Sequence, residues 1–166
     1  MAAHAQGKFW EMHDKLFAGQ AELNPASYEK WAKEIGLNVA KWKADFDGHK
    51  HKANIEADSK RGNEIGANGT PAFFINGIPL SGAQPFEAFK AVIDKELKRA
   101  EVELKKGTSM DKLYEKLLDG AVAAAPPTAA AAGAPPSEHA DIAPGNSPSK
   151  GPKNAAIVLL EFSDFQ

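Results

Sequence analysis

Two histidines separated by one residue are the side chains that come nearest to a metal-binding group. His49 and His51 lie close in the sequence to Asp45, Asp47 and Glu56, and all five carry atoms that can bind a metal ion. Histidines two positions apart do not share a face of a helix, however, and no further ligand follows at a spacing typical of a metal site. The pattern therefore predicts solvated surface histidines and no metal.

Thiol chemistry is the second possibility, and the 166 residues contain no cysteine. The chain by itself therefore offers no thiol nucleophile, thiolate ligand or redox-active dithiol, and we expect no catalytic residue and no cofactor. Twenty basic side chains against 22 acidic ones give no support to nucleic-acid binding. The longest strongly apolar run, residues 155–160, is far shorter than the roughly 20 residues that span a bilayer, so we expect no membrane partner.

The first part of the chain, which would help to position a site, is predicted to form short helices. Apolar spacing, glycine stops and capping residues predict helices over residues 3–17, 24–35, 38–48 and 50–65. Asn24 before Pro25, and Asn38, are typical N-caps. Trp10, Trp31 and Trp42 are predicted to be core residues of these helices.

The pattern changes after residue 66. Residues 72–75 read as a strand, Asn76 and Gly77 are a strong hairpin signal, and residues 78–80 would return as an edge strand because Pro79 lacks a donor. Helices are predicted over residues 85–106 and 111–118. The charges along the first of these two helices, Glu96 and Arg99 among them, predict a solvated surface.

The last part of the chain divides into two segments. Residues 120–154 are rich in alanine, proline, glycine and serine, and predict a semi-extended linker. Residues 157–165 are apolar on both faces, which is typical of a strand in the middle of a sheet. We expect this strand at the end of the sequence to mark a boundary that cuts a following domain.

Three of these stretches together resemble the DsbA-like branch of the thioredoxin fold, a family of bacterial thiol–disulfide oxidoreductases. Residues 66–80 resemble its cis-proline loop and hairpin, residues 2–65 its helical insertion, and residues 155–166 the strand that precedes its Cys-x-x-Cys motif. The resemblance implies an α/β fold that is mostly helical by content. It would be an incomplete or circularly permuted thioredoxin-like fold with an α-helical insertion.

The domain organisation that the resemblance implies has three parts. Residues 1–119 would form the last two-thirds of a DsbA-like domain, with the insertion at 2–65, the hairpin at 66–80 and helices within 85–118. Residues 120–154 would be the linker. Residues 155–166 would be the strand before Cys-x-x-Cys of a following or permuted domain.

The resemblance also implies where the site residues lie. Thr70 and Pro71 occupy the cis-proline positions that contact an extended polypeptide substrate, and Glu161 occupies the position of the family's buried acid. Without a dithiol, Glu161 has no group to exchange protons with, so it would be either a costly buried carboxyl or a solvated one on an undocked strand.

The implied function is that of a fragment of a protein disulfide-exchange enzyme, redox-inactive on its own. The parent would act on extended polypeptides in the periplasm or cell envelope, although no signal peptide opens this sequence. The alternative is a non-catalytic peptide-binding or self-association module. In either case we expect the terminal strand to lie antiparallel beside residues 72–75, within one chain or swapped in a homodimer.

Overall fold

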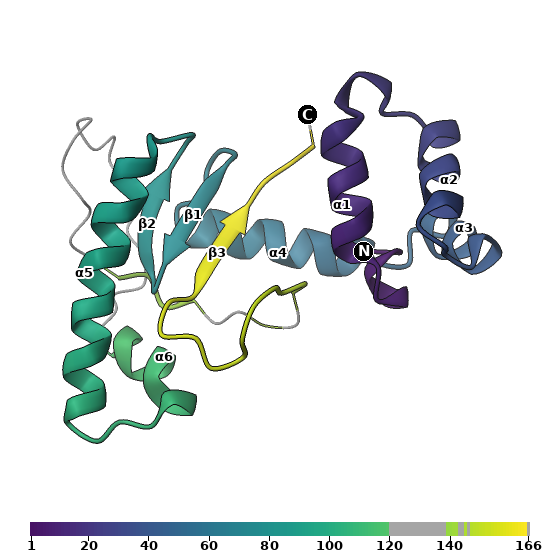
Figure 1. Cartoon of the computed structure of the whole chain (residues 1–166). Helices are drawn as coiled ribbons and strands as arrows, with labels where there is room; N and C mark the ends of the chain where they lie inside the picture. The colour runs from purple at the N-terminus through teal and green to yellow at the C-terminus, as the bar shows by residue number, and fades with distance from the viewer. Residues whose placement is uncertain (120–138, 143–144, 146, 166) are drawn as a thin grey trace. The chain divides into compact units, whose positions relative to one another are not determined.

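The computed structural model describes residues 1–119, 139–142, 145 and 147–165 (Figure 1). Most of the predicted linker, residues 120–138, lies outside the described residues. The chain forms two compact units: unit 1 comprises Met1–Ser59 together with Phe165, and unit 2 comprises Lys60–Asp164.

Unit 1 is built from helices, as predicted. It contains η1 (His4–Gln6), α1 (Phe9–Ala18), η2 (Gln20–Glu22), α2 (Pro25–Glu34), α3 (Val39–Asp47) and the beginning of α4 (Lys52–Glu64). The predicted first helix is broken at Gly7, whose φ of 72° is left-handed. The side chains of Asn24 and Asn38 cap α2 and α3 as expected, by accepting hydrogen bonds from the backbone N–H groups three residues later.

The core of unit 1 gathers around aromatic side chains. Trp31 and Trp42 are buried, as predicted, whereas Trp10 is only half-buried. The ring of Phe165 lies against α1, 5.1 Å between centroids from Phe17 and 5.9 Å from His13.

Unit 2 holds a three-stranded antiparallel sheet of β1 (Ala72–Ile75), β2 (Ile78–Ser81) and β3 (Leu159–Phe162), in the order β2-β1-β3 (Figure 1). Asn76 and Gly77 have φ values of 47° and 85°, and positive φ at both positions is the signature of the predicted type I′ turn. β3 is shorter than predicted. It pairs with β1 in the same chain, with Ala72 opposite Phe162 and Ile75 opposite Leu159.

Helices cover the sheet of unit 2. On one face, α5 (Phe86–Lys105) packs through Phe89 against Phe73, with ring centroids 4.9 Å apart. α6 (Met110–Leu118) packs against α5 through Leu113 and Leu117, which are fully buried with Ala100.

The other face of the sheet is covered differently. Phe74 is buried there together with Ile65, at the end of α4, and with Ala140 and Ile142. The last two residues fall within the segment predicted to be a linker, yet they are 1 % and 2 % exposed. Because apolar burial stabilises a fold, these residues belong to the packed core of unit 2.

The prediction that the charges of α5 form a solvated surface is wrong for Glu96, which is completely buried. Its carboxylate pairs with the Arg99 guanidinium at 3.2 Å, and the ring of His139 also lies close to it, at 3.4 Å.

Candidate functional site

The predicted substrate-binding residues lie at the end of the sheet where β1 begins and β3 ends. The Thr70 hydroxyl donates a hydrogen bond of 2.6 Å to the Asp164 carboxylate, although the two residues are 94 positions apart. Both residues are exposed. The structure therefore brings the loop before β1 next to the chain that leaves β3.

Pro71 positions this loop on the sheet. The Thr70–Pro71 peptide bond is cis, and the Pro71 carbonyl accepts a hydrogen bond of 2.8 Å from the N–H of Gly82, just beyond β2. Segments next to all three strands therefore meet at the end of the sheet where Thr70 lies.

At the opposite end of the sheet, Asn76 fixes the position of β3 through hydrogen bonds from both its backbone and its side chain. Its backbone N–H donates to the Val158 carbonyl at 2.9 Å, its Oδ1 accepts from the Val158 N–H at 2.8 Å, and its Nδ2 donates to the Ala156 carbonyl at 3.1 Å. Asn76 is completely buried. These bonds fix the register in which β3 enters the sheet, and so where Asp164 emerges beside Thr70.

Glu161 does not lie in the environment that the resemblance implied. It stands opposite Phe73 on β1, so it shares the face of the sheet on which α5 packs. β3 is docked, yet Glu161 is exposed. The physical reason is that β3 is an edge strand in the described sheet, and α5 packs against Phe73 of β1. Glu161 is therefore a solvated carboxylate on a docked strand, which neither of the two expected states describes.

The histidine pair near residue 50 does not meet acidic partners. Asp45 instead binds the ammonium groups of Lys41 and Lys50 at 2.8 and 3.0 Å, and these hydrogen bonds lower the pKa of its carboxyl. Across the described part of the chain, no group of three or more histidine, aspartate and glutamate side chains could hold a metal ion.

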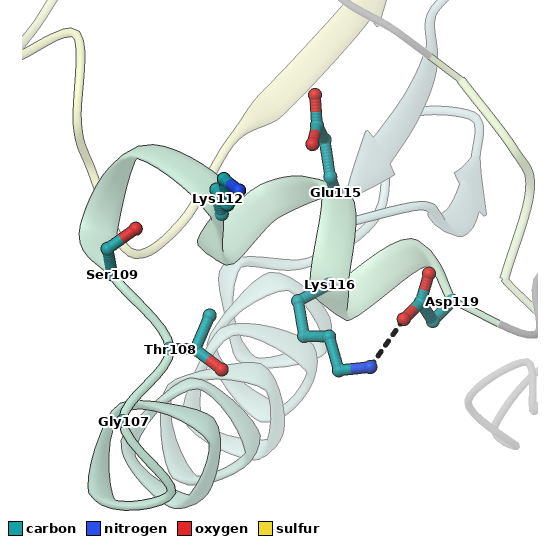
Figure 2. Close-up of a pocket in the computed structure, with 7 residues that line it drawn as sticks. All are labelled: Gly107, Thr108, Ser109, Lys112, Glu115, Lys116 and Asp119. Carbon is teal, nitrogen blue, oxygen red and sulfur yellow. Dashed lines mark hydrogen bonds and ion pairs between the residues drawn. The ribbon is translucent and has the colours of Figure 1, made fainter.

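A shallow hollow lies between the loop that follows α5 and the residues of α6 up to Asp119 (Figure 2). Polar residues line it, and the ion pair between Lys116 and Asp119, 2.5 Å long, closes one side; this contact raises the pKa of Lys116. Neither Thr70 nor Glu161 lines this hollow. We therefore place the candidate site at Thr70 and not here.

Sequence reasoning named Thr70 and Pro71 as candidate site residues but gave no role at the site to Asp164 or Asn76. Asp164 is a polar residue directly after an apolar strand, which is a usual place for a site residue. Asn76 was recognised only as a turn residue, because its bonds to Ala156 and Val158 join segments 80 and 82 positions away.

An antiparallel hairpin with α5 on one face, and a proline loop beside the end of a third strand, are consistent with a thioredoxin-like α/β fold. A sequence model of the DSBA-like thioredoxin domain family matches residues 1–94. The chain belongs to this family. The match includes Thr70 and Pro71 but not Glu161 or Asp164.

Curated relatives match a similar part of the chain. The Na(+)/H(+) antiporter NhaA 3 of Salinispora tropica is 35% identical over 92 residues, which are 55% of this chain and 14% of the antiporter. The Na(+)/H(+) antiporter NhaA of Herminiimonas arsenicoxydans is 33% identical over 93 residues, 56% of this chain and 15% of the antiporter. The chain thus spans about one-seventh of the length of the relatives it matches. No solved structure matches.

The described helices differ from membrane-spanning helices. None of them combines the length and the apolar character that crossing a bilayer requires.

Proposed function

We propose that this chain supplies the polypeptide-binding part of a thiol–disulfide exchange protein. In this proposal, an extended segment of a substrate protein lies along the exposed backbone at Thr70 and Pro71. The dithiol comes from residues that are not among these 166, because the chain contains no cysteine. The chain alone is therefore redox-silent. By family resemblance we place the intact protein in the periplasm or cell envelope.

The observation that carries the proposal is the hydrogen bond between Thr70 and Asp164. In DsbA-like proteins the loop of the cis-proline faces the segment that follows the strand equivalent to β3. In this chain the same two segments meet at an exposed edge, so a substrate bound at Thr70 would lie beside the chain that leaves β3.

A non-catalytic module that binds extended peptides is the second candidate. It is favoured by the position of β3, which has β1 on one side only in the described sheet and so leaves a row of backbone groups unpaired. Self-association by exchange of β3 is a variant of this candidate. We propose no ion transport for this chain, because its match to the antiporters covers so small a part of them.

Peptide binding by the full chain tests the part that both candidates share. We expect a short extended peptide with a blocked cysteine to shift the amide NMR signals of Ala72, Gly82 and Asp164. Thr70→Lys should abolish these shifts by obstructing the edge, and Ser109→Lys, a matched change at an exposed residue of the α5–α6 hollow, should not. Shifts that survive Thr70→Lys would place binding elsewhere.

A redox assay tests the silence that both candidates expect of this chain, and the flanking coding sequence separates the two candidates. The purified chain should not accelerate the reduction of insulin by dithiothreitol; a measurable acceleration would overturn redox silence. A Cys-x-x-Cys motif encoded next to these residues would support disulfide exchange, and a flanking sequence without cysteine would support the non-catalytic module.

A further inference from the structure

A buried ionic cluster in unit 2 takes no part in the proposed function. Glu96 of α5 is completely buried, and its Oε2 accepts a hydrogen bond of 3.2 Å from Nη1 of Arg99. Arg99 also donates to the Leu117 carbonyl at 2.5 Å and makes a short contact with Nε2 of His139. Oε1 of Glu96 has no hydrogen-bond partner among the described residues and lies 3.4 Å from His139 Nε2.

His139 begins a segment, residues 139–142, that is anchored at two further places. The N–H of Ala140 donates to the Gly77 carbonyl at 2.7 Å, which joins the segment to the hairpin turn. The Tyr114 hydroxyl of α6 donates to the Ile142 carbonyl at 2.6 Å. The segment therefore rests on α5, α6 and the turn together, and Ile142 covers Phe74 of the sheet.

The contact between Arg99 and His139 requires a neutral imidazole. The Arg99 N–H can donate to His139 Nε2 only while that nitrogen carries no proton. A proton on Nε2 would break this bond and place two cations side by side, while the orphaned Oε1 of Glu96 would gain a donor. Protonation of His139 thus has two unfavourable effects, both through Arg99, and one favourable effect, through Glu96.

The unfavourable effects prevail in the docked state. Burial, followed by the charge of Arg99, lowers the pKa of His139; Glu96 acts in the opposite direction, and Lys95 adds to the lowering. The other titratable groups of this region are Asp141, which is exposed, and Tyr114, whose pKa is raised to about 12 by burial and which stays neutral.

We propose that residues 139–142 are a proton-sensitive latch: neutral His139 holds the segment on α5, α6 and the hairpin turn, and protonation releases it. A histidine that binds its proton less well in the docked state favours docking at high pH. Docking is therefore strongest above the ordinary histidine value of about 6.5 and weakens as the pH falls below it. Release would uncover apolar surface at Phe74 and Ile65.

The test follows the latch in the full chain by NMR between pH 7.5 and 5. We expect the exchange protection of the Ala140 amide, corrected for intrinsic exchange, to fall below pH 6.5. One proton limits this fall to about tenfold per pH unit. The amide of Ile78 in β2 should stay protected throughout, which separates release of the latch from unfolding.

Two variants make the test specific. His139→Gln keeps an acceptor for Arg99 but cannot be protonated, so the protection of Ala140 should become independent of pH. His49→Asn removes an exposed histidine at a positive φ that asparagine tolerates, and it should retain the parental pH dependence. A pH dependence that survives His139→Gln would overturn the latch.

The titration of the His139 ring in the parent chain provides a readout that needs no variant. The midpoint of its imidazole resonances should coincide with the midpoint of the change at Ala140 and lie below 6.5. Ring titration without a matching change at Ala140, or Ala140 protection that is constant over the whole range, would refute the proposal.

Discussion

The two ends of the sheet in unit 2 are held in opposite ways. At the hairpin end, Asn76 and Gly77 are buried and bind the backbone of two later segments. At the other end, Thr70 and Asp164 are exposed and joined by a hydrogen bond between side chains. Buried polar groups cost much more than exposed ones when they lose a partner. The comparison indicates a fixed end that sets the register and an exposed end, which we propose to be adjustable and to accept a ligand.

Gly77→Ala should weaken the fixed end most. A Cβ at this position would lie 2.6 Å from Leu118 Cδ2 and 2.8 Å from the Ala140 carbonyl oxygen, and φ is +85°. We expect the free energy of unfolding to fall by about 2–4 kcal/mol, from backbone strain and overpacking together. Urea denaturation of the variant and the parent chain measures this difference in the free energy of unfolding.

Gly107→Ala is the matched control, because its φ is +95° and no atom of the described residues lies within 4 Å of the added Cβ. It should cost only the strain, about 1–2 kcal/mol. Equal losses in the two variants would show that the close approach at Gly77 contributes nothing.

Asn76→Gly should have the next largest effect. Glycine keeps the positive φ but removes the side-chain bonds to Ala156 and Val158, at a cost of about 2–3 kcal/mol for two buried hydrogen bonds. Hydrogen exchange of the Val158 amide should accelerate along with the loss of stability. The exposed Asn68→Gly should change stability by less than about 0.5 kcal/mol; a similarly small effect at Asn76 would contradict its role in fixing β3.

Thr70→Val tests the adjustable end. Valine keeps the shape but cannot donate to Asp164, and because both residues are exposed the stability should change by less than about 1 kcal/mol. We expect faster motion of the Asp164 backbone in ¹⁵N relaxation experiments. A loss as large as that of Asn76→Gly would remove the distinction between the two ends.

Glu161→Gln should have the smallest effect. The carboxylate is exposed on a docked strand, so neutralising it should change the free energy of unfolding by less than about 0.5 kcal/mol at pH 7. Thermal unfolding of both proteins measures this. A stabilisation above about 1 kcal/mol would instead indicate that the carboxylate is buried at a cost.

Local signals in the sequence predicted much of this fold. Asn76 and Gly77 specified the hairpin, and Asn24 and Asn38 specified two helix starts, because in each case the residues that determine the conformation are adjacent in the chain. The pairing of the terminal strand with β1 came from the family resemblance and is present in the structure.

Burial that depends on distant partners was not predictable from local pattern. Glu96 looks like a surface residue of a charged helix, and His139, which helps to enclose it, comes from 43 positions further along the chain. Ala140 and Ile142 alternate as strand residues do, but two positions within a polar, proline-rich segment are too short a signal. The solvation of Glu161 likewise depends on distant partners, because α5 packs against Phe73 of β1 and leaves Glu161 of β3 exposed.

Pro79 makes the two margins of the sheet unequal. It stands opposite Phe74, next to the pair that closes the turn, where the amide position points away from β1. Proline has no hydrogen there to offer a visiting strand, so lateral growth of the sheet is discouraged along β2 and permitted along β3. Any additional strand, from whatever source, therefore has one preferred docking margin.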